Sequence, residues 1–86
     1  MTDPKKTFTG DGLRTRPEYD AALIAAADYF TAVRKVGPGQ YERHERSTLP
    51  GVEELARALA NKARRSYMIY AVAGDRDCHV KNIDPT

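Results

Sequence analysis

The side chains that could serve as nucleophile, general base or transition-metal ligand are few in this sequence: one cysteine and two histidines. Cys78 and His79 are adjacent in a segment that alternates like a strand, so their side chains should point to opposite faces. That geometry excludes a local cysteine–histidine nucleophile, whereas Cys78 paired with His44 across a sheet stays open. A structural metal site needs about four ligands, and these three residues do not supply them.

Two carboxylates, Asp75 and Asp77, are close enough in sequence to suggest general acid–base chemistry. They flank Arg76 directly after Gly74, and aspartate is favoured in turns because it hydrogen-bonds the local backbone. We therefore interpret them as turn residues. The sequence predicts no catalytic group, no metal and no cofactor, and we expect a protein that is not an enzyme.

Basic side chains form two groups that could contact phosphates if the fold brings them to one face. Nine consecutive positions, from Arg57 to Arg65, contain no acid. The other group, in the predicted first hairpin, contains Arg34, Lys35, Arg43 and Arg46. The alternative is a solvated surface with helix-end charges, because Glu42, Glu45, Glu53 and Glu54 are interleaved with these cations.

Tyrosines on or near predicted strands add amphipathic rings, which can stack on bases or anchor a protein interface. More often such tyrosines are half-buried packing residues. Tyr67 and Tyr70 differ in strand parity, so at most one of them faces a given side. Taken together, the predicted partner-binding residues are Tyr41, Arg43, Arg46, Arg57, Lys62, Arg64 and Arg65.

The composition limits the class of protein. The 86 residues suffice for one domain with a thin core, too little to build a deep catalytic pocket. Fourteen Lys and Arg against twelve Asp and Glu give a charge of +2, which argues against a DNA mimic and only permits nucleic-acid contact. Without a signal-like segment or a long apolar run, we expect no membrane contact and a cytoplasmic location, in the host cell if the protein is phage-encoded.

The N-terminal part of the chain predicts an arm followed by a helix. Residues 1–14 hold little apolar surface and are predicted to be a flexible arm preceding a single domain over residues 15–86. Thr15 and Glu18 have the spacing of a capping box, and the apolar face that follows predicts a helix over residues 15–27. Residues 29–36 suit a strand, although continuation of the helix is the other reading.

The middle of the chain predicts a hairpin and a second helix. The turn Gly37-Pro38-Gly39-Gln40 separates strands at residues 30–36 and 41–47. Thr48 or Gly51 is the expected N-cap of the helix. Its predicted buried stripe is Val52, Leu55, Ala56, Leu59 and Ala63, and its predicted last turn contains Lys62, Arg64 and Arg65.

The last part of the chain predicts an apolar hairpin, with strands at residues 66–73 and 78–83. The fold class is therefore α+β: an αββαββ domain whose four-stranded, mainly antiparallel sheet is packed by one or two helices. Residues 67–73 are apolar on both strand faces. The first helix is expected to lie beside the second or on the opposite face of the sheet, and the opposite face would explain this pattern.

From Tyr29 to Ile83, about two-thirds of the chain, the layout resembles small accessory proteins of phages and mobile elements, including several anti-CRISPR proteins. It consists of a polar hairpin, a helix start at Thr48-Leu49, an Ala/Arg-rich helix and an apolar hairpin. The resemblance is architectural and implies a non-catalytic inhibitor that binds a bacterial defence complex, a protein or nucleoprotein. The alternatives are a small nucleic-acid-binding protein using the Arg/Lys surface and a cysteine- or metal-dependent enzyme.

Overall fold

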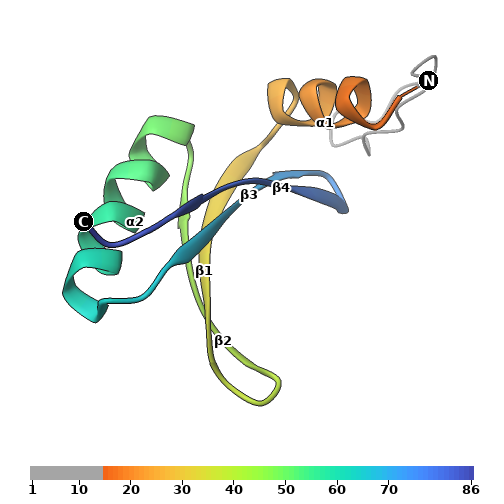
Figure 1. The fold of residues 1–86 in the computed structure, drawn as a ribbon. Coiled ribbons are helices and arrows are strands. Elements are labelled where there is room, and N and C mark those ends of the chain that lie inside the picture. Colours follow the sequence, from red (N-terminus) through yellow and green to blue (C-terminus); the bar gives the residue numbers. More distant parts are fainter. Residues whose placement is uncertain (1–14) are drawn as a thin grey trace.

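The computed structural model describes residues 15–86, so the arm predicted for residues 1–14 lies outside the described part of the chain. The elements are α1 (Arg16–Ala25), β1 (Tyr29–Gly37), β2 (Gln40–Arg46), α2 (Leu49–Ala63), β3 (Tyr67–Ala73) and β4 (Arg76–Ile83) (Figure 1). This order confirms the predicted αββαββ fold of the α+β class. It also settles residues 29–36, which form a strand and not an extension of the first helix.

All four strands pair antiparallel in the order β2-β1-β3-β4. Helix α2 carries the chain from the edge strand β2 back to β3 in the middle of the sheet. Strand β1 pairs with β2 from Phe30 to Gly37, with a register shift after Lys35, but with β3 only from Tyr29 to Val33. The β1–β2 hairpin therefore continues past the rest of the sheet, as Figure 1 shows.

Side-chain caps fix where the helices begin. The Thr15 hydroxyl accepts from the Glu18 amide at 3.2 Å, and Glu18 Oε1 accepts from the Thr15 amide at 2.9 Å, which confirms the capping box. Thr48, one of the two predicted candidates, caps α2 by accepting from the Gly51 amide at 3.1 Å. Helix α1 ends earlier than predicted because the Asp28 amide donates to Val72 O at 2.7 Å, which commits the chain to the sheet.

The C-terminal end of α2 differs from the prediction. The helix stops at Ala63, and Arg64 adopts the left-handed conformation at φ 56° as the C-cap, so only Lys62 lies in the last turn. The predicted buried stripe is correct at Val52 and Ala56, which are fully buried, and at Leu59 and Ala63, which are partly buried and pack against the core. Ala60 is buried as well and was missed, while Leu55 is only partly buried and lies outside the core.

Both helices pack on the same face of the sheet. Helix α2 contacts all four strands, and α1 contacts β3 and β4 beside it. Leu23 from α1 joins a core that includes Phe30, Ile69 and Tyr67. Of the two positions predicted for α1, the one beside α2 is correct and the one on the opposite face is wrong, because the small side chains of the β3–β4 hairpin leave room for Leu23 on the face that α2 already covers.

The second face of the sheet is covered by no helix among residues 15–86. It carries the alternate residues of β3, namely Met68, Tyr70 and Val72, which are half-buried. None of the helices described is long and apolar enough to cross a membrane.

Candidate binding surface

A cluster of four polar side chains lies where the β1–β2 hairpin leaves the sheet. Glu42 and His44 are two residues apart on β2 and so point to the same face. Arg34 is directly opposite Glu42 on β1, and Tyr67 begins β3 beside them. Strand register alone therefore brings these four side chains together on the helix side of the sheet.

Glu42 is the centre of this root cluster, defined as Arg34, Glu42, His44 and Tyr67. Its Oε1 accepts from Arg34 Nη2 at 2.9 Å and from Arg34 Nε at 3.2 Å. Its Oε2 accepts from the Tyr67 hydroxyl at 2.8 Å and lies 2.7 Å from His44 Nε2. The Arg34 guanidinium also lies 5.7 Å from the centre of the Tyr67 ring, so the arginine is held by charge, hydrogen bond and ring face together.

These contacts stabilise the charged form of Glu42 strongly. Hydrogen bonds from His44, Tyr67 and Arg34 lower the pKa of the Glu42 carboxyl to about 2. Burial and the nearby carboxylate raise the pKa of the Tyr67 phenol, and the hydrogen bond to Tyr67 raises that of Arg34. A carboxylate with so low a pKa is a poor general base at neutral pH. We conclude that the root cluster braces the hairpin against β3 and is not a site of proton transfer.

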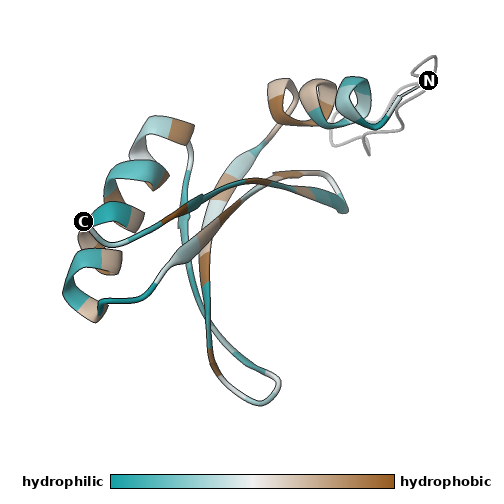
Figure 2. Cartoon of the chain, viewed as in Figure 1, coloured by the Kyte–Doolittle hydropathy of each residue, from teal (hydrophilic) through white to brown (hydrophobic). Residues whose placement is uncertain are grey.

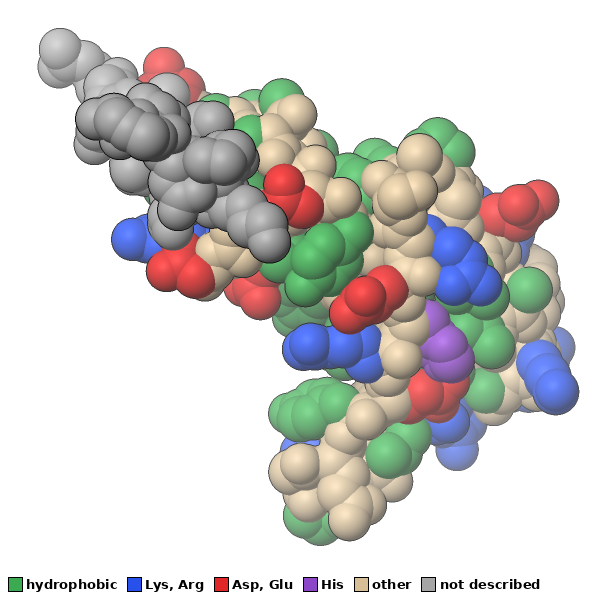
Figure 3. All heavy atoms as spheres, turned by 180° about the vertical axis from the view of Figure 1, so that it is seen from behind, with side chains coloured by type: hydrophobic (Ala, Val, Ile, Leu, Met, Phe, Trp, Pro, Cys, Tyr) green, Lys and Arg blue, Asp and Glu red, His purple; other side chains and the backbone are tan. Residues whose placement is uncertain are grey.

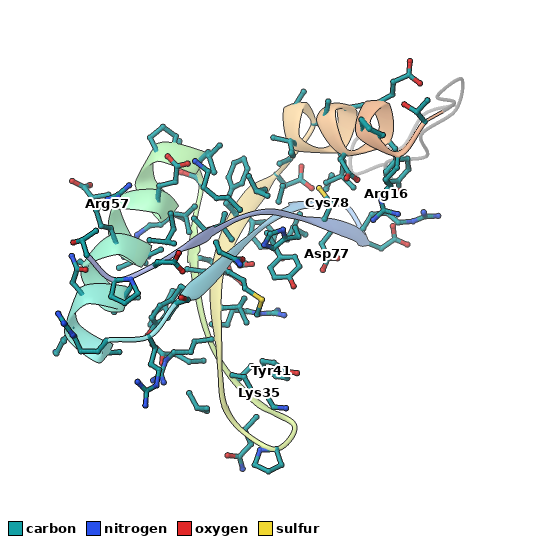
Figure 4. All side chains as sticks on the ribbon, viewed as in Figure 1. Arg16, Lys35, Tyr41, Arg57, Asp77 and Cys78 are labelled. Carbon is teal, nitrogen blue, oxygen red and sulfur yellow. The ribbon has the colours of Figure 1, made fainter. Side chains whose placement is uncertain are left out.

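Beyond the root cluster, the hairpin exposes apolar and basic side chains side by side. Val36 and Tyr41 are the large hydrophobic residues that the described chain exposes most, at 50% and 58%. Lys35 is directly opposite Tyr41, and Arg43 follows on the same face of β2. Neither Lys35 nor Arg43 forms an ion pair with any residue between 15 and 86. We call Lys35, Tyr41 and Arg43, which share one face, and Val36, which lies at the register shift next to the turn, the hairpin surface; Figure 4 labels Lys35 and Tyr41.

The structure divides the seven predicted partner-binding residues between two sides of the molecule. Tyr41 and Arg43 lie on the hairpin face that no described helix covers, while Arg46 has the opposite parity and lies opposite Phe30. The rest are on α2 or directly after it: Arg57, Lys62, Arg64 and Arg65. Arg57 points outward from α2, away from the sheet (Figure 4). The two basic groups do not form one face.

Acidic groups interrupt the basic ones further. Arg34 is paired with Glu42, and Lys81 is paired with Glu53 on α2. Figure 3 shows acidic and basic side chains interspersed with apolar ones over the side of the molecule seen from behind. A phosphate-binding face would need both cationic groups on one side of the molecule. The described residues do not meet this condition.

The cysteine and histidines are too far apart to cooperate. Cys78 is 4% exposed on the helix side and lies under α1 (Figure 4), whereas its neighbour His79 is exposed on the other face. His44 and Cys78 belong to strands at opposite edges of the sheet, about 14 Å apart at the usual strand spacing. Burial raises the pKa of the Cys78 thiol, which disfavours the nucleophilic thiolate. This geometry excludes the pairing that the sequence left open.

No group of three or more His, Cys, Asp or Glu side chains in the described part of the chain is placed to hold a metal ion.

The sequence reasoning missed the root cluster and the role of Val36. A signal for the Arg34–Glu42 pair was present: the turn at residues 37–40 fixes the hairpin register, and register places Arg34 opposite Glu42. What the sequence did not reveal is that β3 begins at Tyr67, level with this pair. That position determines where the hairpin leaves the sheet and which of its side chains lie beyond it.

In comparisons with protein-family models, curated proteins and solved structures, the chain matches none. The resemblance to anti-CRISPR proteins thus stays a prediction.

Proposed function

We propose that this protein is a non-catalytic binding module that attaches to another protein, alone or within a nucleoprotein complex, through its projecting β1–β2 hairpin. One observation carries the proposal: the projecting hairpin exposes Tyr41 on the same face as Lys35 and Arg43, two cations that have no ion-pair partner among the described residues, and it also exposes Val36 next to its turn.

The chemistry of this surface suits a partner that offers an apolar pocket rimmed by carboxylates. A tyrosine supplies a large contact area and a hydroxyl, and an arginine can pair with a carboxylate through two parallel hydrogen bonds. The root cluster holds the strands in one conformation before binding, so less conformational entropy is lost when the partner binds. Rigid presentation of a few anchors is how small interfaces reach useful affinity.

An inhibitor of a bacterial defence complex is the concrete form that the resemblance to phage accessory proteins implies. Such an inhibitor needs no chemistry of its own, since it acts by occupying a surface that the complex uses. The hairpin surface has the apolar and cationic character that this role requires. Direct binding of free nucleic acid is less well supported, because the basic residues are divided between two sides of the molecule.

Site-specific photo-crosslinking tests this proposal. A photoreactive phenylalanine replaces Tyr41 in one variant and Arg57, which is exposed on the outer side of α2, in a matched control. After irradiation in host lysate, we expect the Tyr41 position to capture a discrete protein that the Arg57 position does not. Excess unlabelled wild-type protein should compete for that partner, and Lys35→Glu with Arg43→Glu should not.

Two outcomes would overturn the proposal. Equal capture from both positions would show that the hairpin is no preferred surface. Capture of nucleic acid without protein from Tyr41 would replace the protein partner with the nucleic-acid reading.

A further inference from the structure

Strand β2 forms one edge of the sheet, and no described strand pairs with its outer side. An unpaired edge presents backbone N–H and C=O groups that can pair with a further strand. Proteins usually block such an edge with a bulge, a proline or a lysine. From Tyr41 to Arg46, β2 contains none of these, and its register with β1 is continuous over this range. This edge is therefore open to another strand.

The opposite edge of the sheet, β4, is built differently. Its register with β3 shifts between Ile69 and Tyr70, so that Val80 is skipped, and it carries Lys81 beside the shift. A bulge bends and twists a strand, which makes the strand a poor template for pairing. A strand that adds to this sheet is therefore expected at β2 and not at β4.

The charged side chains of β2 follow an order that is complementary to its own reverse. On the two sides of His44, the strand carries Glu42 and Arg43, then Glu45 and Arg46. Reversing the strand about His44 places each glutamate opposite an arginine. We propose that β2 pairs antiparallel with β2 of a second copy of this chain, about a two-fold axis that is perpendicular to the sheet and passes beside His44.

In this pairing, Arg43 is opposite Glu45 of the partner subunit, and Glu42 is opposite Arg46 of the partner subunit. Directly opposite side chains of an antiparallel pair lie on the same face of the sheet and close together. Opposite charges in such positions stabilise the pairing, and like charges destabilise it. Each contact occurs twice because a two-fold interface is symmetric.

The contact between Arg43 and Glu45 of the partner subunit is the one that can form new hydrogen bonds. Both residues are exposed, and neither has an ion-pair partner within residues 15–86. Glu42 is already held by its own root cluster. Arg46 of the partner subunit therefore adds charge attraction to Glu42, and the Arg43–Glu45 contact gives the pairing its directional bonds.

Other registers of the same two-fold pairing bring like charges together. The axis keeps the helix side of both copies on one side of the joined sheet, so residues of equal parity are opposite each other. One residue must then meet its own copy at the axis. A centre at any of the charged residues of β2 would set two like charges directly against each other, and a centre beyond either end would leave most of the strand unpaired. His44 is the one centre that pairs the whole charged run without this conflict.

The dimer would have one continuous sheet, and backbone hydrogen bonds across the axis would supply much of its affinity. A single pairing of six residues is only about 20 Å long. Such an interface lies at the small end of specific ones, so we expect dissociation in the micromolar to millimolar range. Of the hairpin surface, the pairing engages only the charge of Arg43. The inference concerns self-association and does not rest on the proposed function.

Sedimentation equilibrium over a concentration series tests the dimer with the protein alone. We expect the apparent mass to rise from that of one chain toward that of two as the concentration approaches about 1 mM. Arg43→Glu and Glu45→Arg each turn both Arg43–Glu45 contacts into like-charge contacts, so each should weaken self-association at least fivefold. Arg57→Glu makes the same charge change on α2 and should have no effect. A mass that stays at one chain throughout would overturn the inference, as would an equal loss in Arg57→Glu.

A mixture of the two variants makes the test specific for the register. In a heterodimer, the glutamate introduced by Arg43→Glu would face the arginine introduced by Glu45→Arg. The native Glu45 of the first variant would face the native Arg43 of the second. We therefore expect two poorly associating variants to form a heterodimer when mixed, about as tight as the wild-type dimer. Continued monomers in the mixture, with both variants folded by circular dichroism, would contradict the proposed pairing.

Discussion

The two hairpins of this protein are built alike and held very differently. The β3–β4 hairpin is fixed at its turn: the Gly74 amide donates to Asp28 Oδ2 at 2.8 Å, and Arg76 Nη1 donates to the Tyr19 hydroxyl at 3.1 Å. Helix α1 packs against it. The β1–β2 hairpin extends past the sheet and is held mainly by the root cluster. Figure 2 shows the same contrast, with β2 mainly hydrophilic and apolar segments recurring along β3.

The difference indicates that the β3–β4 hairpin contributes to the core of the fold, whereas the β1–β2 hairpin is exposed. Tyr67, Ile69, Ala71 and Ala73 of β3 are buried, so the β3–β4 hairpin is part of the core. The part of the β1–β2 hairpin that lies beyond Val33 adds little to the core and still keeps a defined shape.

The largest loss in the free energy of unfolding is expected for a substitution in the β3–β4 hairpin. Ile69 is fully buried in the middle of the sheet. Ile69→Ala should lower the free energy of unfolding by about 2–5 kcal/mol, because it removes core contacts and leaves a cavity. Chemical denaturation followed by circular dichroism measures this change. A loss below about 0.5 kcal/mol, the size typical of surface positions, would mean that Ile69 is not in the core.

The next largest loss of stability is expected in the root cluster. Glu42→Gln removes the charge at the centre of the root cluster and should lower the free energy of unfolding by about 1–3 kcal/mol. Glu45→Gln on the same strand is the matched control, and it should stay within about 0.5 kcal/mol of wild type. Equal loss in both variants would show that the cluster contributes nothing beyond ordinary surface charge.

The lowered pKa of Glu42 in the root cluster also predicts that the stability of the protein depends on pH. The pKa of Glu42 is lowered from its usual 4.5 to about 2 in the folded protein, so the unfolded chain binds its proton more readily. The stability due to Glu42 should therefore be complete above pH 4.5 and be lost as the pH falls through 2. Melting temperatures across this range should converge for wild type and Glu42→Gln. Parallel curves would contradict the lowered pKa.

A substitution at the C-cap of α2 should raise the free energy of unfolding by a smaller amount. Arg64 ends α2 at φ 56°, where a residue with a Cβ is strained and glycine is not. Arg64→Gly should therefore increase the free energy of unfolding by about 0.5–1 kcal/mol. Arg65→Gly is the control and should give no gain. A loss of stability in Arg64→Gly would show that the arginine side chain stabilises the helix end more than its backbone strain costs.

Much of the fold could be predicted from local chemistry, because local chemistry decides it. The Thr15–Glu18 box, the Thr48 cap and the Gly37–Gln40 turn act within a few residues and appear where the sequence indicates. The position of α1 depends on long-range packing of Leu23, which no pattern within the helix reveals. The same holds for Leu55, whose spacing fits the buried stripe although it is only partly buried and does not join the core.

The candidate site was only half predictable for a similar reason. Tyr41 and Arg43 were expected on the exposed hairpin, and the structure places them there. Arg46 and the α2 cations were expected to work with them, but strand parity and the position of the helix separate the two groups. The root cluster depends on where β3 starts, a fact that belongs to the assembled sheet.

The most direct test of the central claim is a calorimetric titration of the partner that Tyr41 captures. Combined Lys35→Glu and Arg43→Glu should weaken binding at least tenfold, about 1.4 kcal/mol, and change the free energy of unfolding by no more than about 0.5 kcal/mol. Arg57→Glu with Arg65→Glu carries the same charge change on the other side and should bind like wild type. Unchanged affinity in the hairpin variant, or a tenfold loss in the α2 variant, would contradict the claim that the projecting hairpin is the binding surface.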